Sequence, residues 1–388
     1  MKLLVATHFY STHKGGVEIV AGELSRALAE RYGHQITWMA SNVSPLPESS
    51  AAAMRPLHCS NVTEKWLGFP MPLPFPSALR EISRQVLQTQ VLIVHDSLYL
   101  TNIFATFLAR RRSIPVLLIQ HIGAVPYKNP VLRFAMALAN RLIAKRMLSK
   151  ANRVVFISGT TKKFFETVEF RRPPALIYNG LRMDLPEPDD RIKFPTERTS
   201  IRTILFIGRF VEKKGLSVIR ILARRMPDIR WRLCGWGEIN PEDWHLPNVE
   251  VARDLGPQEL AIAYQSSDLL VLPSVGEGLP LVVQEALCFG CPVIASDELI
   301  LADPWLADEV ATAAVDLSDA ECTAEAWAKA IPAYGLSNID RMSLRERARA
   351  HYSWNAAAGE YDKILKEMVY ENEPHTKAKK AQRKGRIQ

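Results

Sequence analysis

The stretch DLLVLPSVGEGLPLVVQEALCFGCPVIAS, residues 268–296, holds two apolar runs separated by a glycine-bounded loop and a helix-like segment. The runs DLLVLP, 268–273, and PVIAS, 292–296, are apolar apart from Asp268 and Ser296 at their ends, which is typical of strands that helices cover on both faces. Pro280 suits the first turn of a helix that we expect to end near Phe289. A strand, a helix and a second strand in this order predict a parallel α/β unit.

Short apolar runs alternate with longer amphipathic segments over the rest of the chain as well. This alternation predicts further strands at 3–7, 35–40, 91–95, 115–120, 153–158, 175–178, 203–208, 230–235 and 249–252. The stretch 184–200 interrupts it with three prolines and mixed charge, which is typical of a linker. Two α/β halves imply a cleft between them, with ligands bound at the carboxyl ends of the strands.

These patterns predict the domain organisation of the chain. We expect an N-terminal domain over 1–183, a linker over 184–200 and a C-terminal domain over 201–353. The segment 354–370 predicts a last helix, which we expect to pack back on the first domain. The basic tail 374–388 is expected to be disordered.

The composition limits the classes of protein to be considered. A chain of 388 residues with 47% hydrophobic and 23% charged residues is not disordered, collagen-like or a small disulfide scaffold. No apolar run is long enough to span a bilayer, and the first residues lack the pattern of a secretory signal. Five cysteines fit a reducing cytoplasm. For the isolated CxxC of Cys288 and Cys291 we favour two buried residues over a redox or zinc role.

The positive charge is unevenly distributed. The formal net charge is +8, yet six Lys and Arg lie in 375–388, and 97–165 holds twelve Lys and Arg without any Asp or Glu. A nucleic-acid-binding protein would explain such charge, but the basic stretch lacks interleaved aromatic residues and any recognised module. We therefore expect no nucleic-acid partner.

Two loops that follow predicted strands are suited to binding phosphate. Gly15 and Gly16 lie between the first strand and a helix, where glycines allow close backbone approach and the helix start offers N–H groups. A tight turn without a ligand is the alternative for this loop. In IGRFVEKKG, residues 207–215, Arg209 and Lys214 lie on one strand–loop–helix and can both reach a diphosphate. There they would stabilise negative charge that develops on a leaving group.

Two glutamates mark the third loop and its helix. Glu277 lies in the glycine-flanked loop, and Glu285 lies among apolar residues of the following helix, with Gln284 as a polar neighbour. A carboxylate on a buried helix requires a hydrogen-bonding partner, and the two hydroxyls of a ribose would provide one. The alternative is a glutamate on the solvated face of the helix.

These segments together resemble a known family. The pattern of Glu277, seven residues and Glu285 resembles the donor-site signature of the family 4 retaining glycosyltransferases of GT-B fold, and GRFVEKKG resembles their G-R-x-x-x-x-K-G loop. Further matches are KGGVEIVAGELSRAL (14–28), VLIVHDS (91–97), LIQH (118–121), IYNGL (177–181) and SWNAAAGEY (353–361). The resemblance covers nearly the whole chain. It implies an α/β protein of two Rossmann-like domains that face each other across a cleft. The N-terminal domain, 1–183, would bind the acceptor, and the C-terminal domain, 201–353, would bind the nucleotide sugar.

The resemblance also implies a reaction and its residues. The expected activity is transfer of a hexose-type sugar, with retention, from a UDP- or GDP-sugar to a lipid-linked or saccharide acceptor. The pathway would be bacterial surface polysaccharide or glycolipid biosynthesis. Retention would follow from attack on the same face with the leaving phosphate as base, and neither a metal nor another cofactor would be needed. The implied residues are Glu277, Arg209, Lys214 and His121 for catalysis, and Gly15, Gly16, Gly208, Glu285, Gly278, Leu279 and Leu281 for donor binding.

Some features depart from this pattern or leave alternatives open. The glycine pair expected after PVIAS is replaced by DELILADPW, residues 297–305, which leaves the identity of the sugar open. A nucleotide-sugar isomerase or epimerase of similar architecture would keep the nucleotide site without an acceptor. An NAD-dependent oxidoreductase would rely on GWGEIN, residues 235–240, which has Asn240 at the third glycine position. His8, His13, His95 and His121 follow strands near the predicted cleft, but their scatter disfavours a zinc site.

The basic segment 131–150 predicts a helix with a charged and an apolar face. Arg133, Arg141 and Lys145 form the basic face, and the apolar face comprises Leu132, Met136, Leu142, Ile143 and Met147. We expect Leu132 and Ile143 to lie in the protein core and the basic face to dock on anionic lipid. This predicts a cytoplasmic protein that binds the inner face of the cell membrane peripherally.

Overall fold

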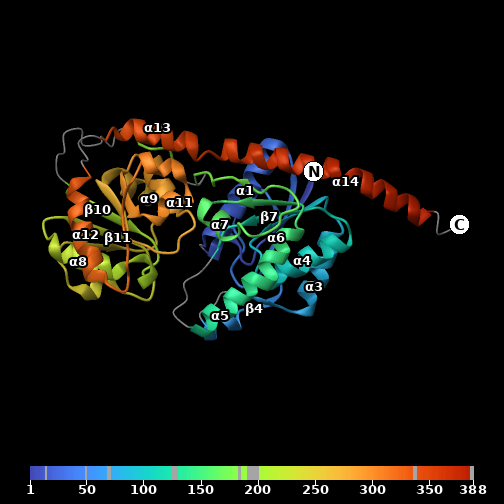
Figure 1. Cartoon of the computed structure of the whole chain (residues 1–388), viewed down its shortest axis with the longest axis horizontal. Helices are drawn as coiled ribbons and strands as arrows, with labels where there is room; N and C mark the ends of the chain where they lie inside the picture. Colours follow the sequence, from blue (N-terminus) through green and yellow to red (C-terminus); the bar gives the residue numbers. More distant parts are fainter. Residues whose placement is uncertain are drawn as a thin grey trace. The chain divides into compact units, whose positions relative to one another are not determined.

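The computed structural model describes residues 1–13, 15–48, 50–67, 71–123, 130–181, 185–189, 201–334 and 339–384. The chain divides into two compact units (Figure 1). One comprises Met1–Asn179 with Trp354–Gln388, and the other comprises Gly180–Ser353. Of the expected linker 184–200, only residues 185–189 lie within the described part of the chain.

The first unit is built on a parallel sheet of seven strands in the order β3-β2-β1-β6-β7-β8-β9. These strands are β1 (Lys2–Ala6), β2 (Gln35–Ser41), β3 (Ala53–Leu57), β6 (Val91–His95), β7 (Val116–Gln120), β8 (Arg153–Phe156) and β9 (Ala175–Leu176). All the strands predicted for this half are present. Strand β3 was not predicted, because its sequence AMRPL is largely exposed and contains a proline, as edge strands can.

Helices cover both faces of the first sheet. Helix α1 and helix α14 lie on one face, and α3 and α4 lie on the other (Figure 1). The cluster beneath α3 and α4 contains Leu92, Val94 and Ala105, all fully buried. The helices of this unit are α1 (Gly16–Tyr32), α2 (Val62–Leu67), α3 (Pro76–Val86), α4 (Leu100–Arg111), α5 (Pro130–Ala139), α6 (Lys145–Lys150), α7 (Gly159–Phe164) and α14 (Trp354–Lys384), with a π-helical turn, η2 (Asn140–Ala144), between α5 and α6. The short strands β4 (Cys59–Ser60) and β5 (Leu73–Pro74) form an antiparallel pair.

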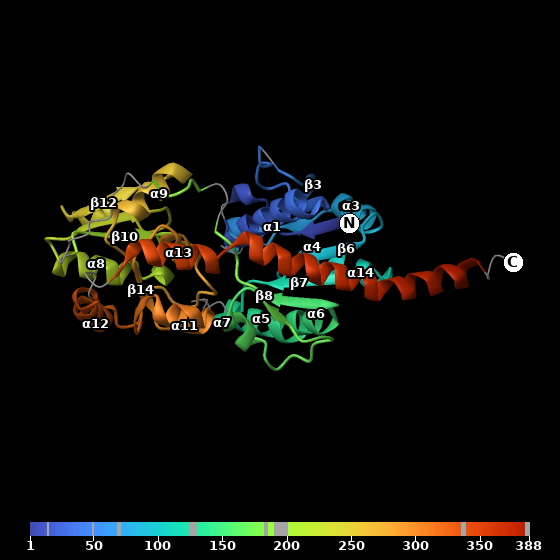
Figure 2. The ribbon, with the colours of Figure 1, turned by 90° about the horizontal axis from the view of Figure 1, so that it is seen from above.

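Helix α14 returns the end of the chain to the first unit, where it lies along α1 (Figure 2). Its Asp362 is buried and lies 2.9 Å from Nε2 of His34, and Glu371 lies 2.9 Å from Arg153. Helix α14 runs to Lys384 and so extends into the basic segment 374–388, for which the sequence predicted disorder.

The second unit is a parallel sheet of six strands in the order β12-β11-β10-β13-β14-β15. The strands are β10 (Thr203–Ile207), β11 (Arg230–Cys234), β12 (Val249–Ala252), β13 (Leu269–Leu272), β14 (Val293–Ser296) and β15 (Ala311–Ala313). Helices α8 (Leu216–Arg225) and α12 (Ala320–Ala333) pack together on one face. The other face carries α9 (Pro257–Ser266), α10 (Leu281–Cys288) and α13 (Arg341–His351), and α11 (Glu298–Ala302) follows β14.

Two expectations about composition can be compared with this fold. Cys288 ends α10 and Cys291 precedes β14, and both are fully buried free thiols, which confirms the interpretation of the CxxC as two core residues. Within the described ranges, no helix is both long enough and apolar enough to cross a membrane.

The docking of α14 can be tested by a core substitution. Leu365 of α14 is fully buried, and Leu365→Ala should lower the free energy of unfolding by about 2–5 kcal/mol, because it leaves a cavity. Tyr370 on the same helix is 80% exposed, and Tyr370→Ala should change this free energy by less than about 0.5 kcal/mol. Chemical denaturation measures both, and equal effects would contradict the docking of this helix.

Candidate functional site

The topology of the second sheet selects one edge for a site. Strands β10 and β13 are neighbours, and the chain continues from β10 to β11 on one side and from β13 to β14 on the other. Such a reversal of strand order opens a crevice at the carboxyl ends of the two central strands, where open α/β sheets bind ligands. The loops that leave these ends are 208–215 and 273–280, which carry the predicted phosphate-binding and acidic residues.

The two loops are in direct contact. Gly215 has φ +77° and precedes α8, and a β-carbon on it would lie 2.2 Å from the carbonyl oxygen of Pro273. Only glycine combines this left-handed backbone with so close an approach. Next to it, Nζ of Lys214 lies 2.9 Å from Oε1 of Glu277, and Nζ of Lys213 lies 3.8 Å from the same oxygen.

The lysines set the charge of Glu277. Burial opposes ionisation of this carboxyl, but the positive charges of Lys214 and Lys213 outweigh it and lower the pKa of Glu277 below its usual value. A carboxylate and two ammonium groups therefore coexist at the carboxyl ends of β10 and β13. The exposed guanidinium of Arg209 lies 5.1 Å from the ring of Trp236, which holds it by a cation–π contact.

A small pocket opens beside Glu277. It is lined by residues at the carboxyl ends of β13 and β14, namely Leu272, Ser274, Glu277, Gly278, Pro280, Ala295, Ser296, Glu298 and Leu299. Glu298 belongs to the segment that replaces the expected glycine pair. Its Oε2 accepts a hydrogen bond of 2.9 Å from the backbone N–H of Gly276. Glu298 was not predicted as a site residue, and this hydrogen bond fixes the loop that carries Glu277.

Glu285 lies deeper, on α10, and is almost completely buried. The hydroxyl of Tyr264, on α9, donates a hydrogen bond of 2.7 Å to its Oε2. The buried carboxylate of Glu285 therefore has a hydrogen-bonding partner within the protein, as a buried charge requires. Tyr264 stacks on Phe289 and was missed, because nothing in the sequence links α9 to α10 across the core.

The remaining predicted residues are divided between the two units. Gly15, Gly16 and His121 belong to the first unit. Gly208, Gly278, Leu279 and Leu281 belong to the second unit, where Leu281 begins α10 and the N–H of Gly208 donates to the carbonyl oxygen of Cys234. The segment GWGEIN follows β11 and leads into a one-turn 3-10 helix, Pro241–Trp244, whereas a dinucleotide fingerprint requires an α-helix there.

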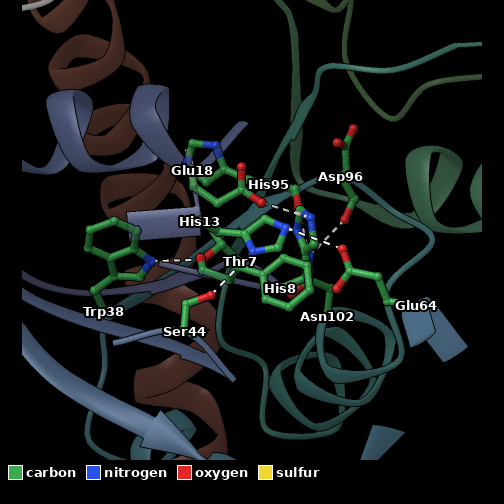
Figure 3. A network of polar contacts seen from close by, with 11 residues as sticks. Thr7, His8, His13, Glu18, Trp38, Ser44, Glu64, His95, Asp96 and Asn102 are labelled. Atoms are coloured by element: carbon green, nitrogen blue, oxygen red, sulfur yellow. Dashed lines mark hydrogen bonds and ion pairs between the residues drawn. The ribbon is translucent and has the colours of Figure 1, made fainter. Parts of the chain in front are cut away.

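The first unit contains a cluster of buried titratable side chains at the carboxyl ends of β1, β6 and β7 (Figure 3). Nε2 of His8 lies 2.8 Å from Oε1 of Glu18, and the ring of His8 stacks on Tyr99 with centroids 3.6 Å apart. Nδ1 of His95 lies 2.9 Å from Nε2 of His121. The predicted contact residue His121 is therefore part of a histidine pair.

The Asp96 side chain fixes the loop that carries His121. Asp96 has φ +64°, and its Oδ1 accepts hydrogen bonds from the backbone N–H groups of His121 and Ile122 and from Nε2 of Gln120. Burial raises the pKa of Asp96 to about 6, although the two backbone N–H groups partly offset it. Burial also lowers the pKa of His121 to about 3 and that of His95 well below its usual value, so both rings are neutral at pH 7.

The segment α5–η2–α6 exposes several apolar side chains. Phe134 is 71% exposed and Leu142 is 58% exposed, and Leu138 and Ile143 are exposed as well. The expectation that Ile143 lies in the core was wrong, whereas Met147 is buried. The side chain of Leu132 lies outside the described residues. Arg133 and Arg141 are exposed, and Lys145 donates a hydrogen bond of 2.8 Å to Thr167.

Solved structures share this architecture. Sucrose-phosphate synthase from Thermosynechococcus elongatus aligns over 95% of this chain and 99% of its own, with a TM-score of 0.68 and 18% identity. Anabaena Alr3699/HepE, solved in complex with UDP, aligns over 95% of this chain and 100% of its own, with a TM-score of 0.59 and 15% identity. Two parallel-sheet α/β domains of this kind define the GT-B fold of glycosyltransferases.

Family models identify the group within that class. Residues 14–185 match Glycosyltransferase Family 4, and residues 201–332 match Glycosyl transferases group 1. The chain belongs to glycosyltransferase family 4, as the resemblance of its motifs predicted.

Curated relatives match in part. A D-inositol 3-phosphate glycosyltransferase from Corynebacterium aurimucosum is 31% identical over 204 residues, which are 46% of this chain and 46% of that protein. An uncharacterized glycosyltransferase from Haemophilus influenzae is 37% identical over 106 residues, which are 24% of this chain and 29% of that protein. The chain thus spans less than half of the length of these relatives.

The raised pKa of Asp96 predicts a pH dependence of stability. Since the pKa of Asp96 is about 6 in the folded chain against about 4 in an unfolded one, ionisation above pH 4 destabilises the fold. Asp96→Asn removes this effect. The free energy of unfolding of the variant minus that of the wild type should therefore increase by about 3 kcal/mol between pH 4 and pH 7.

Glu18→Gln is the control with the opposite sign. Burial opposes ionisation of Glu18, but its hydrogen bond and ion pair with His8 lower its pKa, so this carboxylate stabilises the fold above its usual pKa. Relative to wild type, Glu18→Gln should therefore lose stability as the pH rises from 4 to 7. Denaturation curves at each pH measure both variants, and parallel profiles would contradict the assignment.

Proposed function

We propose that this chain is a retaining glycosyltransferase that transfers a hexose-type sugar from a UDP- or GDP-sugar to a lipid-linked or saccharide acceptor. The observation that carries the proposal is the contact between Lys214 and Glu277 at the carboxyl ends of β10 and β13, with Arg209 on the same loop as Lys214. Cations placed at a strand-order reversal suit a diphosphate, and a carboxylate beside them suits a sugar hydroxyl. UDP bound to Anabaena Alr3699/HepE, which shares the fold, supports a nucleotide donor.

In this proposal each residue has a distinct task. Arg209 and Lys214 bind the diphosphate and stabilise the charge that develops on it as the bond to the sugar breaks. Glu277, kept ionised by Lys214 and Lys213, accepts hydrogen bonds from the transferred sugar. Glu285, oriented by Tyr264, accepts from the ribose hydroxyls.

Further groups complete the proposed reaction. The backbone around Gly208 and Gly278–Leu281 and the loop of Gly15 and Gly16 contact the donor. His121 contacts the sugar and the acceptor. The leaving phosphate serves as base on the face that it leaves, so configuration is retained without a protein nucleophile. Because the two cations neutralise the diphosphate, we propose that no metal is required.

The acceptor and pathway follow from the relatives and from the surface. Several curated relatives are named D-inositol 3-phosphate glycosyltransferases, and another is an amylovoran biosynthesis glycosyltransferase from Erwinia amylovora. These names support an acceptor with several hydroxyl groups and a role in surface polysaccharide or glycolipid synthesis. We place the reaction at the cytoplasmic face of a membrane.

The membrane part of the proposal rests on the segment α5–η2–α6. Phe134 and Leu138 lie four residues apart on α5, so their exposed side chains share one side of this helix. Leu142 in the following π-helical turn is exposed as well, and Arg133 and Arg141 are the neighbouring basic residues in sequence. Exposed apolar side chains flanked by arginines suit the boundary between lipid headgroups and acyl chains in an anionic bilayer.

The roles of Arg209 and Glu285 predict separable kinetic effects. After a thermal-shift panel of UDP-, GDP- and ADP-sugars has identified the donor, Arg209→Ala should lower kcat about 10²–10³-fold, because it removes stabilisation of the leaving group. Glu285→Ala should mainly raise the KM for the donor. Arg220, exposed on α8, provides the control Arg220→Ala, which should leave both constants unchanged.

Several results would contradict this activity. Wild-type kcat in Arg209→Ala would refute the phosphate assignment. Conversion of the sugar nucleotide without release of a nucleoside diphosphate would indicate an isomerase. No thermal shift with any of the sugar nucleotides, together with binding of NAD, would indicate an oxidoreductase.

Membrane docking predicts binding that depends on lipid charge. The protein should co-sediment with vesicles that contain phosphatidylglycerol, and less with pure phosphatidylcholine or at high salt. Phe134→Ser should weaken this binding about tenfold or more, as expected when one buried aromatic side chain is lost. Ile262, an exposed apolar residue of the second unit, provides the control Ile262→Ser. Equal binding to neutral vesicles, or equal effects of the two substitutions, would overturn this part of the proposal.

A further inference from the structure

The segment GWGEIN, residues 235–240, does not form a dinucleotide site, and its backbone contacts indicate another task. It follows β11, which pairs with β10 in parallel as far as Cys234 and Ile207. Backbone hydrogen bonds continue this pairing beyond the strand ends, with the N–H of Gly208 donating to Cys234, that of Phe210 to Trp236 and that of Ile239 to Phe210. The loop that carries Arg209 is therefore joined to the loop that carries Trp236.

Two glycines allow these loops to touch. A β-carbon on Gly235 would lie 1.9 Å from the carbonyl oxygen of the residue before Arg209. A β-carbon on Gly237 would lie 2.4 Å from the carbonyl oxygen of the residue after Arg209. A side chain at either position would therefore separate the loops. Trp236 lies between the two glycines, and the centre of its ring is 5.1 Å from the guanidinium carbon of Arg209.

The far end of the segment is tied to β12. Oδ1 of Asn240 accepts a hydrogen bond of 2.7 Å from Nη2 of Arg253, which follows β12, and Nδ2 of Asn240 donates one of 2.8 Å to Asp243. The loop is thus held on both sides. Trp236 itself is 46% exposed, although tryptophan side chains are largely buried on average. Its position therefore follows from the backbone around it and not from burial of its ring.

The cations at this end of the sheet differ in their partners. Nζ of Lys214 lies 2.9 Å from a carboxylate oxygen, and Nη2 of Arg253 lies 3.7 Å from another. The guanidinium of Arg209 forms neither a hydrogen bond nor an ion pair with any residue that the structure describes. Its contact in this part of the chain is the ring of Trp236.

An aromatic partner suits an arginine that has to bind phosphate. A carboxylate would occupy the N–H groups of the guanidinium and neutralise its charge, so a diphosphate would have to displace it. An aromatic ring attracts the cation through its π electrons and leaves the N–H groups free to donate. The ring also restricts a long side chain, which then loses less conformational entropy when the diphosphate binds.

We propose that Trp236 is a positioning residue, which holds the guanidinium of Arg209 ready for the diphosphate of the donor. This inference rests on the proposed glycosyl transfer, in which Arg209 stabilises the charge on the leaving diphosphate. Trp236 acts through Arg209 alone. Its effect on binding and turnover should therefore disappear when Arg209 is absent.

A double-mutant cycle on the full chain tests this link. With the donor that the thermal-shift panel identifies, Trp236→Leu should lower kcat/KM about three- to tenfold, because it removes one cation–π contact. Trp236→Phe should restore most of this loss, since its ring still attracts the cation. In the Arg209→Ala background, Trp236→Leu should have no further effect, because no guanidinium is left to position.

Binding of UDP and GDP, measured by isothermal titration calorimetry, gives a readout that does not depend on turnover. The nucleoside diphosphate that binds the wild type should bind Trp236→Leu about three- to tenfold more weakly. Arg209→Ala and the double variant should bind it with equal affinity. Trp244, partly exposed on the 3-10 helix that follows, provides the matched control. Trp244→Leu should leave affinity and kcat/KM within twofold of wild type.

The outcomes separate this inference from the proposed function. Failure of the wild type to bind either nucleoside diphosphate refutes the proposed function, and the role of Trp236 with it. Affinity and kcat/KM that fall in Arg209→Ala but stay at wild-type values in Trp236→Leu overturn the inference alone. Additive effects of the two substitutions, or a loss in Trp236→Phe as large as that in Trp236→Leu, would show that the ring does not act through Arg209 and would overturn it equally.

Discussion

The close approach of Gly215 to the carbonyl oxygen of Pro273 is the contact on which the candidate donor site depends. Parallel pairing of β10 with β13 brings the ends of two strands together that are far apart in sequence. The missing side chain at Gly215 then allows the two following loops to touch, which places Lys214 against Glu277. The charges of this site are therefore positioned by backbone packing.

The two units manage buried charge in different ways. In the second unit, Lys213 and Lys214 lie next to Glu277 where two loops touch, so their opposite charges compensate each other. These side chains remain partly exposed and can reach a ligand. In the first, Glu18 is compensated by His8, whereas Asp96 keeps one oxygen without a partner among the described residues. An uncompensated carboxylate in a buried position destabilises a fold, and such positions are characteristic of binding and catalytic sites.

Sequence patterns predicted the strands and the charged loops well, because both are set by residues that are close together in the sequence. Apolar runs such as 91–95 and 115–120 indicated strands covered on both faces, and the structure has the buried strands Val91–His95 and Val116–Gln120 there. The basic helix was less predictable. Its apolar spacing indicated a core face through Ile143, but the π-helical turn Asn140–Ala144 adds a residue to one turn and leaves Leu142 and Ile143 exposed. A helical wheel cannot anticipate such an insertion.

The sequence by itself determined the parallel α/β class, the family and the residues of the loops that follow β10 and β13. These properties follow from periodicity and from short motifs, which are local. Only the tertiary structure decided which side chains meet: Tyr264 with Glu285, Glu298 with Gly276, and Glu18 with His8. No sequence motif links the two partners of any of these contacts. The partners meet because the pairing of strands and the packing of helices bring their segments together.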